Sequence, residues 1–138
     1  MSNYKIINYR IFIYSLNLSA MKQNIILEKS QAFAIRIVNL SRHLKKKKVE
    51  VILINQLLRS GTSIGANVFE ATVSISKKEF TSKISISLKE ARETTFWLKV
   101  LFDTKTISEK EYLSISHDCT ELEKILFSII KKVRMNNA

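Results

Sequence analysis

The sequence is organised around Leu57-Leu58-Arg59-Ser60-Gly61-Thr62-Ser63-Ile64-Gly65-Ala66-Asn67, a segment that contains both glycines of the chain. The apolar spacing on either side predicts one amphipathic helix through this segment, and a glycine inside a helix costs about 1 kcal/mol relative to alanine. Since residues i and i+4 share one helical face, Gly61 and Gly65 form a smooth strip, which the small Thr62 and Ala66 widen. We therefore expect the strip to be a place of close helix packing or of assembly, with no catalytic loop in it.

The composition indicates a single, helix-rich domain. The chain has 138 residues, no proline and two glycines, whereas folds with many strands need such residues at most connections. Its lone cysteine, Cys119, excludes an internal disulfide and fits the reducing cytoplasm, where we expect the protein to be located. The net charge of +11 favours a polyanionic partner such as nucleic acid, although solubility alone also explains such a charge.

Residues 1–20 differ from the rest of the chain because they contain no acidic residue. An apolar patch after two basic residues has some features of a secretory signal, but Ser15, Asn17 and Ser19 interrupt it. The patch is also far shorter than the roughly 20 residues of a membrane-spanning helix, so we expect no membrane association. We expect residues 1–20 to be a weakly ordered extension or a mis-assigned start, with translation beginning at Met21.

Four amphipathic helices are predicted within residues 21–138. Apolar residues recur at three- and four-residue spacings over about residues 24–45, 49–74, 77–103 and 109–134. The last two helices each begin with a capping box, in which Ser76 precedes Glu79 and Ser108 precedes Glu111 by three residues. Because helices of this length joined by short links pack against antiparallel neighbours, the sequence predicts an all-α, antiparallel up-down-up-down four-helix bundle.

Three segments, in this order along the chain, resemble the bacterial 23S rRNA intervening-sequence proteins. They are NIILEKS at residues 24–30, QLLRSGTSIGAN at residues 56–67 and SLKEARET at residues 87–94. The resemblance covers about residues 22–134, with one departure at Val68-Phe69, where the family more often has Ile-Ala. It implies a left-handed bundle, rings of five subunits in some members and no catalytic activity. The family is also similar to the accessory variability protein of diversity-generating retroelements, a basic pentamer that binds nucleic acid and a reverse transcriptase.

No catalytic, metal or cofactor site is predicted. His117, Asp118 and Cys119 are consecutive, so their side chains point in different directions on a helix and cannot form a triad. No spacing of His, Cys or carboxylate residues matches a metal site, and the G-x-x-x-G segment lacks the strand that precedes a phosphate loop. One enzymatic alternative remains, because Arg36 and His43 form an Arg-x6-His pair that resembles the motif of HEPN-type ribonucleases. Such a pair would act on an RNA phosphate as electrostatic stabiliser and general base.

Basic residues gather at both ends of the predicted bundle, and they favour contacts with nucleic-acid backbone phosphates. Cations at the C-terminal end of a helix are also favoured by the helix dipole alone, and no aromatic residues alternate with them to stack bases. The cluster of Arg42 and Lys45 to Lys48 lies near Lys105 in the predicted bundle. The candidate contacts are Arg42, Lys45, Lys46, Lys47, Lys48, Lys77, Lys78, Lys131, Lys132 and Arg134.

Polar and aromatic residues crowd the two central family-like segments. In one interpretation, the second and third helices close on the glycine strip and these residues pair across that seam within the chain. In the other, some of them form a contact between subunits, where tryptophan and arginine are enriched. The candidates are Arg59, Gly61, Gly65, Asn67, Glu70, Arg92, Glu93 and Trp97.

We therefore expect a non-enzymatic protein that forms a homo-oligomer, with a ring of five as the form the resemblance implies, and that binds RNA or DNA through backbone phosphates. The alternative is an adaptor that binds a protein partner and no nucleic acid. A HEPN-like ribonuclease ranks third.

Overall fold

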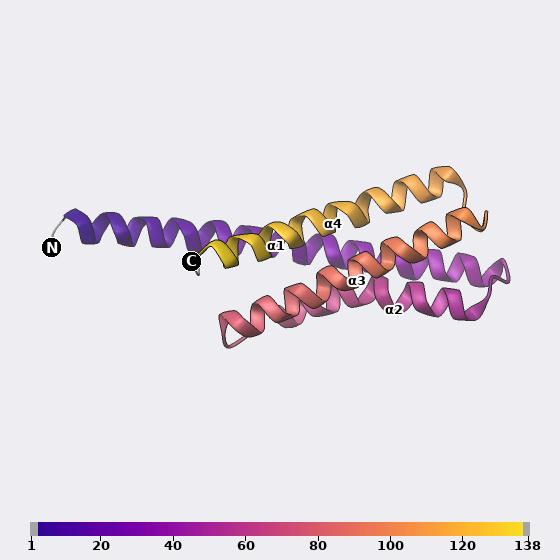
Figure 1. The fold of residues 1–138 in the computed structure, drawn as a ribbon, viewed down its shortest axis with the longest axis horizontal. Helices are drawn as coiled ribbons and strands as arrows, with labels where there is room; N and C mark the ends of the chain where they lie inside the picture. Colours follow the sequence, from indigo (N-terminus) through magenta and orange to yellow (C-terminus); the bar gives the residue numbers. More distant parts are fainter. Residues whose placement is uncertain (1–2, 137–138) are drawn as a thin grey trace.

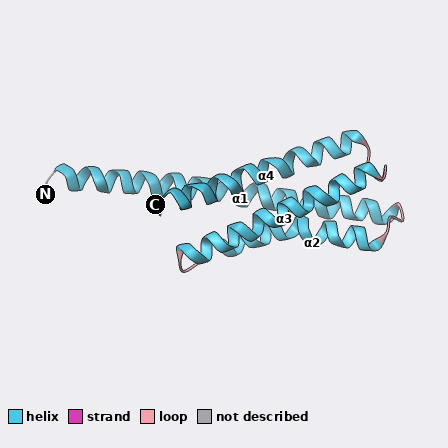
Figure 2. Ribbon diagram, in the orientation of Figure 1, coloured by secondary structure: helices cyan, strands magenta, loops and turns pink. Residues whose placement is uncertain are grey.

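The computed structural model describes the backbone of residues 3–136 and the side chains of residues 24–136. Within this part, four α-helices follow one another: α1 (Asn3–Lys46), α2 (Val51–Ala71), α3 (Lys77–Asp103) and α4 (Glu109–Asn136). No strand occurs among these residues, and short loops join the helices (Figure 2). The predicted all-α fold with four helices is confirmed.

The first helix, α1, is longer than the sequence pattern predicted. It begins at Asn3, whereas we expected a helix start near residue 24 after a separate extension. Residues 3–23 contain no proline or glycine that would interrupt a helix. Figure 1 shows this first part of α1 continuing beyond the other three helices. Residues 1 and 2 lie outside the described part, and translation from Met21 stays a prediction.

The second helix, α2, is shorter than expected at both ends, since it spans Val51–Ala71 where the pattern predicted residues 49–74. The Thr72 hydroxyl donates a hydrogen bond to the Phe69 carbonyl at 2.6 Å. A local bond of this kind offers the backbone an alternative to continuing the helix.

Side chains fix where α3 and α4 begin. Ser76 Oγ accepts a hydrogen bond from the Glu79 N–H at 3.1 Å, and Ser108 Oγ accepts one from the Glu111 N–H at 3.1 Å. The Glu111 carboxylate in turn accepts the Ser108 N–H at 2.8 Å, whereas Glu79 accepts the N–H of Ile75 at 3.0 Å. Both predicted helix starts are confirmed, and the reciprocal capping box is complete at α4.

The four helices surround one core. Each helix packs against two others, because α1 and α3 both contact α2 and α4. Figure 1 shows the α1–α2 and α3–α4 connections at one end of the bundle and the α2–α3 connection at the other. We call the first the two-loop end (residues 46–51 and 103–109) and the second the one-loop end (residues 71–77 and the last turns of α4).

The core consists of aliphatic side chains from all four helices, and Ile37, Leu57, Leu98 and Leu126 are each 0% exposed. Burying one such side chain stabilises the fold by about 1.5–3 kcal/mol. No helix within the described residues combines the length and apolar character needed to cross a membrane.

The glycine strip of α2 faces α1 of the same chain. A Cβ added at Gly61 would lie 2.7 Å from Ile37 Cγ1, and one added at Gly65 would lie 3.1 Å from the carbonyl oxygen of Ser30. The expectation that the third helix closes on the strip is therefore wrong. α3 packs on the neighbouring side of α2, where the buried Ser87 hydroxyl donates to the Ile64 carbonyl at 2.8 Å. Two faces of α2 are thus packed closely, one against α1 and the other against α3.

Candidate functional site

The cationic side chains fall into two groups, of which the first is paired with carboxylates. These pairs lie along the length of the bundle, either across a seam between two helices or, in one case, along α3. Exposed pairs contribute only about 0–1 kcal/mol each, but they neutralise six of the cations on the sides of the bundle. The pairs are Lys29–Glu121, Arg36–Asp118, Arg59–Glu93, Lys83–Glu70, Arg92–Glu123 and Lys99–Asp103.

The second group has no carboxylate partner among the described residues, and it includes all ten candidates for nucleic-acid contact. Five of them (Arg42 and Lys45 to Lys48) belong to the last turns of α1 and its connection to α2, at the two-loop end. The other five (Lys77, Lys78, Lys131, Lys132 and Arg134) lie at the one-loop end, in the first turn of α3 and the last turns of α4. Unneutralised positive charge is thus concentrated at the two ends.

Two lysines at the two-loop end adopt the left-handed backbone conformation. Lys48 has φ 59° and Lys105 has φ 57°, each two residues beyond the end of a helix, α1 and α3 respectively. Glycine is the usual residue there, and a side chain costs about 1–2 kcal/mol. The left-handed residue turns the backbone so that the next N–H groups can bond the last carbonyls of the helix. After α3, for example, the Thr106 N–H donates to the Leu101 carbonyl at 2.8 Å. Sequence analysis missed both conformations, although the absence of glycine outside residues 61 and 65 was a signal for them.

At the one-loop end, Lys77, Lys78 and Arg134 line one depression of about 460 Å³ between α3 and α4. Lys131 and Lys132 are not part of its lining. The structure therefore brings three of the five predicted contacts at this end together. The hydroxyl side chains that also line the depression were not singled out from the sequence, because nothing in the α3 pattern distinguishes them from ordinary exposed positions.

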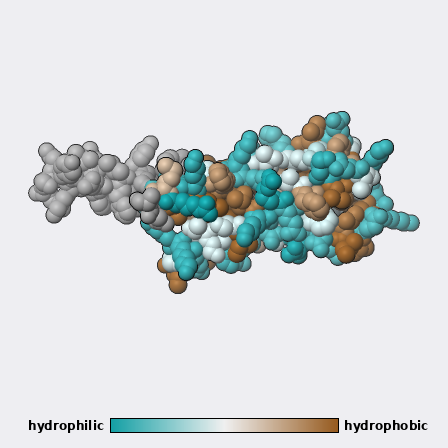
Figure 3. All heavy atoms as spheres, in the orientation of Figure 1, coloured by the Kyte–Doolittle hydropathy of each residue, from teal (hydrophilic) through white to brown (hydrophobic). Residues whose placement is uncertain are grey.

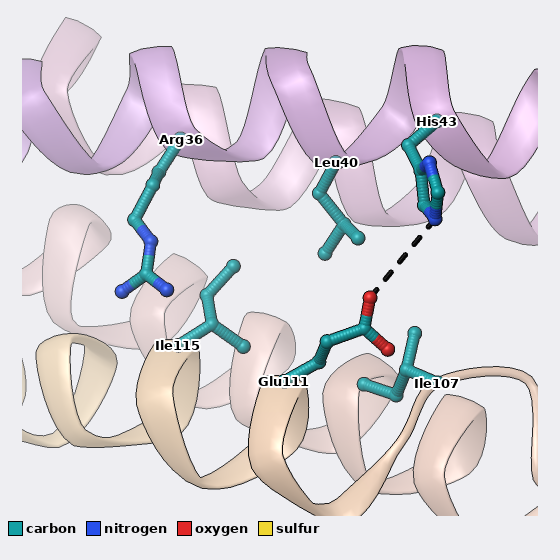
Figure 4. A pocket seen from close by; sticks show the side chains of 6 residues that line it. All are labelled: Arg36, Leu40, His43, Ile107, Glu111 and Ile115. Carbon is teal, nitrogen blue, oxygen red and sulfur yellow. Dashed lines mark ion pairs between the residues drawn. The ribbon is translucent and has the colours of Figure 1, made fainter.

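A groove of about 290 Å³ runs between α1 and α4, and it contains the Arg36–His43 pair (Figure 4). Figure 4 shows both side chains extending from α1 towards α4, above the apolar Ile107 and Ile115 and beside Glu111. His43 Nε2 lies 4.0 Å from Glu111 Oε1. The two residues do share one face, as the Arg-x6-His spacing predicted.

Arg36 is already occupied by acceptors on α4. Its guanidinium donates to Asp118 Oδ2 at 2.7 Å, to Ser114 Oγ at 2.7 Å and to the Ser114 carbonyl at 3.2 Å. The Asp118 carboxylate neutralises the charge that a phosphate would need. Arg36 therefore ties α1 to α4, and its charge is not free to bind a phosphate beside His43.

The polar residues of the family-like segments pair within the chain. Glu93 Oε1 accepts a hydrogen bond from Arg59 of α2 at 3.0 Å and from Trp97 Nε1 at 3.3 Å. Asn67 donates to the Ser63 carbonyl at 2.8 Å, within α2. Next to this cluster, burial and then the charge of Glu93 raise the pKa of Glu90. Of these bonds, the one between Arg59 and Glu93 joins α2 to α3 within the chain, as the intramolecular interpretation expects.

Arg92 belongs to a second polar cluster, which joins α3 to α4. Arg92 pairs with Glu123 at 3.0 Å, and the Thr95 hydroxyl donates to the same carboxylate. Sequence analysis did not identify Thr95 and Glu123, because residues 28 positions apart meet only once the helices pack.

Cys119 is a buried core residue. Its Sγ donates to the Ala91 carbonyl at 3.4 Å, and burial raises the pKa of the thiol to about 11. The neighbouring His117 is 77% exposed in its side chain and points away from the core. Among the residues with described side chains, no group of three His, Cys, Asp or Glu residues is placed to hold a metal ion.

Comparisons with known proteins identify similar chains. The family model described as 23S rRNA-intervening sequence protein matches residues 22–128. Among solved structures, the crystal structure of a protein of unknown function from Bacteroides thetaiotaomicron, assigned to the S23 ribosomal protein family, is 48% identical. The match covers 80% of this chain and 98% of that chain, with a TM-score of 0.78. No curated protein matches the chain.

Proposed function

Since the chain belongs to the 23S rRNA-intervening sequence protein family, we propose that it is a cytoplasmic, non-enzymatic bundle that self-associates and binds RNA or DNA through backbone phosphates. The similar crystal structure is of a protein of unknown function. The proposed binding of nucleic acid therefore rests on the distribution of charged residues in this chain.

The separation of paired and unpaired cations is the observation that supports phosphate binding. Six cations along the bundle are neutralised by carboxylates, while ten at the ends have no such partner among the described residues. Lys89 and Lys124 are two further cations without an ion pair to a described residue, in the middle of α3 and α4, so the unpaired charge is concentrated at the ends and not confined to them. Charge needed only for solubility would not require this concentration. The two strained lysines, Lys48 and Lys105, add to the argument, because a cation is kept where glycine would be more stable.

Self-association is supported by apolar side chains that the single chain leaves exposed. On the face drawn in Figure 3, hydrophobic residues form patches between the hydrophilic ones, including at the two-loop end. Phe96 is 57% exposed and packs edge-to-face against Trp97, with ring centroids 5.0 Å apart. Exposed aromatic groups of this kind are typical of protein interfaces. From the family resemblance we also propose a ring of five subunits and a relation to the accessory variability protein of diversity-generating retroelements.

An antiparallel, left-handed up-down-up-down arrangement is also part of the proposal. Residues later in α1 pair with residues earlier in α4: Lys29 pairs with Glu121, Arg36 with Asp118 and His43 with Glu111. This order is the one that opposite helix directions produce. The handedness comes from the family resemblance.

The non-enzymatic assignment is supported by the neutralised Arg36, which is not free to stabilise a phosphate in a transition state beside His43. Replacing His43 by alanine tests the HEPN-like alternative. If the purified protein cleaves RNA and His43→Ala abolishes cleavage while leaving the thermal melting curve unchanged, the non-enzymatic assignment is overturned.

Binding of a structured RNA, followed by fluorescence anisotropy from low to physiological salt, tests the central function. Phosphate contacts predict an affinity that falls steeply with salt, with a slope in log K against log salt of about −0.9 for each duplex phosphate contacted. Absence of binding at low salt would instead favour the adaptor, which binds a protein partner and no nucleic acid. Light scattering on the same sample tests assembly, and a strict monomer at micromolar concentration would exclude the ring.

A further inference from the structure

The depression at the one-loop end has the composition of an anion site. It lies between the first three turns of α3 and the last turn of α4, with a volume of about 460 Å³. Three cations and three hydroxyl groups line it together with one apolar residue, Val133. The polar lining consists of Lys77, Lys78, Arg134, Thr81, Ser82 and Ser85.

No carboxylate lines this depression. Lys77, Lys78 and Arg134 form no ion pair with any described residue. The acidic residue closest along the chain, Glu79, accepts the N–H of Ile75 at 3.0 Å and is thereby held at the start of α3. The positive charge of the depression is therefore not cancelled by the protein itself.

Helix electrostatics do not explain the two lysines. Lys77 and Lys78 occupy the first turn of α3, where the helix dipole is positive and favours acidic residues by about 0.3–1 kcal/mol. Arg134, in the last turn of α4, is where the dipole does favour a cation. The lysines thus repel both the helix end and each other, and an anion between them would relieve that repulsion.

The hydroxyl groups differ in what they can donate. Thr81 Oγ1 donates to the Lys77 carbonyl at 2.8 Å, whereas Ser82 and Ser85 make no side-chain hydrogen bond with described residues. Two hydroxyl protons therefore remain available beside the three cations. Lysine ammonium groups, an arginine guanidinium and serine hydroxyls are all donors that suit phosphate oxygens.

We propose that this depression binds one phosphate group, with Lys77, Lys78 and Arg134 supplying the charge and Ser82 and Ser85 supplying hydroxyl donors. Its volume of about 460 Å³ exceeds that of a bare phosphate, so the depression has room for part of a nucleotide that carries the group. That nucleotide is either free or part of a nucleic-acid strand. The second case rests on the proposed function, and the first is independent of it.

Amide shifts in nuclear magnetic resonance spectra of the full chain test the site. The probes are inorganic phosphate and adenosine 5′-monophosphate, added in exchange for chloride at constant ionic strength, and then a short single-stranded RNA. The expected result is a saturable change centred on Thr81, Ser82 and Ser85. Lys78→Gln and Arg134→Gln should each weaken binding at least about tenfold, the loss typical of one charged hydrogen bond. Lys89→Gln is the matched control, because Lys89 is an exposed lysine of α3 with no described ion pair and lies outside the depression.

Shifts that do not saturate, or that respond equally to Lys78→Gln and Lys89→Gln, would overturn the site. The outcomes also separate this site from the proposed function. If phosphate and the nucleotide bind but RNA does not, the site stands as a nucleotide site and the proposed function fails. If RNA binds but neither small anion shifts residues 81–85, the proposed function stands and the site fails.

Discussion

Replacing Gly61 by alanine tests the packing of α1 on the glycine strip. The new Cβ would lie 2.7 Å from Ile37 Cγ1 and 2.9 Å from Cγ2, and Ile37 is 0% exposed. Both atoms are bonded to the β-carbon of a branched side chain, which is stiff at χ1 and cannot turn away. Overpacking of this kind costs about 1–3 kcal/mol, and the better helix propensity of alanine offsets about 1 kcal/mol of it. We expect a net loss of about 1 kcal/mol in the free energy of unfolding.

A double-mutant cycle with Ile37→Ala isolates the contact. Ile37→Ala removes every Ile37 atom that approaches the new Cβ, so it should destabilise the Gly61→Ala protein by less than it destabilises the wild type. We expect a coupling energy of about 1–2 kcal/mol from urea unfolding followed by circular dichroism. Gly65→Ala is the control for the coupling, because its Cβ would lie nearest to Ser30, 3.1 Å from the backbone carbonyl oxygen, and not to Ile37. Its coupling energy with Ile37→Ala should stay within about 0.5 kcal/mol.

Additive effects of Gly61→Ala and Ile37→Ala would refute this packing. The glycine strip would then contact a helix of another subunit, and Gly61→Ala would lower the mass seen by light scattering while leaving the monomer folded.

Three further predictions follow from individual residues. The Cys119 thiol, with its pKa raised to about 11, should react with a thiol reagent at pH 8 only after urea unfolding; rapid reaction in the native protein would contradict its burial. Lys105→Gly should raise the free energy of unfolding by about 1 kcal/mol, because glycine accepts the left-handed backbone, and should weaken RNA binding. No gain in stability would contradict the strain. Hydrogen bonds from Ser108 lower the pKa of Glu111, so its stabilisation is present at neutral pH and lost as pH falls through its folded-state pKa. Glu111→Gln should therefore lower the free energy of unfolding at pH 7. In urea unfolding at decreasing pH, the difference in this free energy between the variant and the wild type should become smaller.

Local patterns were sufficient to predict most of the fold. The three- and four-residue spacing of apolar residues identified four helices, and the positions of Ser76 and Ser108 located the starts of α3 and α4, because a helix start is decided within one turn. The pattern does not predict the start of α1, because the composition changes near residue 20 while no proline or glycine there breaks the helix.

Contacts between distant residues could not be predicted. The sequence showed that the glycine strip needs a close neighbour, but the choice of α1 over α3 depends on how four faces pack together, as the Gly61–Ile37 approach shows. Likewise, the spacing of Arg36 and His43 placed both on one face, but the acceptors that occupy Arg36 lie 78 and 82 residues away. Charge counting predicted basic ends, whereas the division into paired and unpaired cations required the structure.

RNA affinity measured for two matched double variants tests the proposed function most directly. Lys46→Gln with Lys47→Gln removes two unpaired charges at the two-loop end, while Lys89→Gln with Lys124→Gln removes two exposed, unpaired charges from the middle of α3 and α4. Both double variants have the same net charge, so a purely non-specific attraction would treat them alike. We predict that the first weakens binding and makes the salt slope less steep by about 1.8, as two lost duplex phosphate contacts would. We predict that the second leaves both values near those of the wild type. Equal effects of the two variants would contradict a phosphate-binding role for the ends of the bundle.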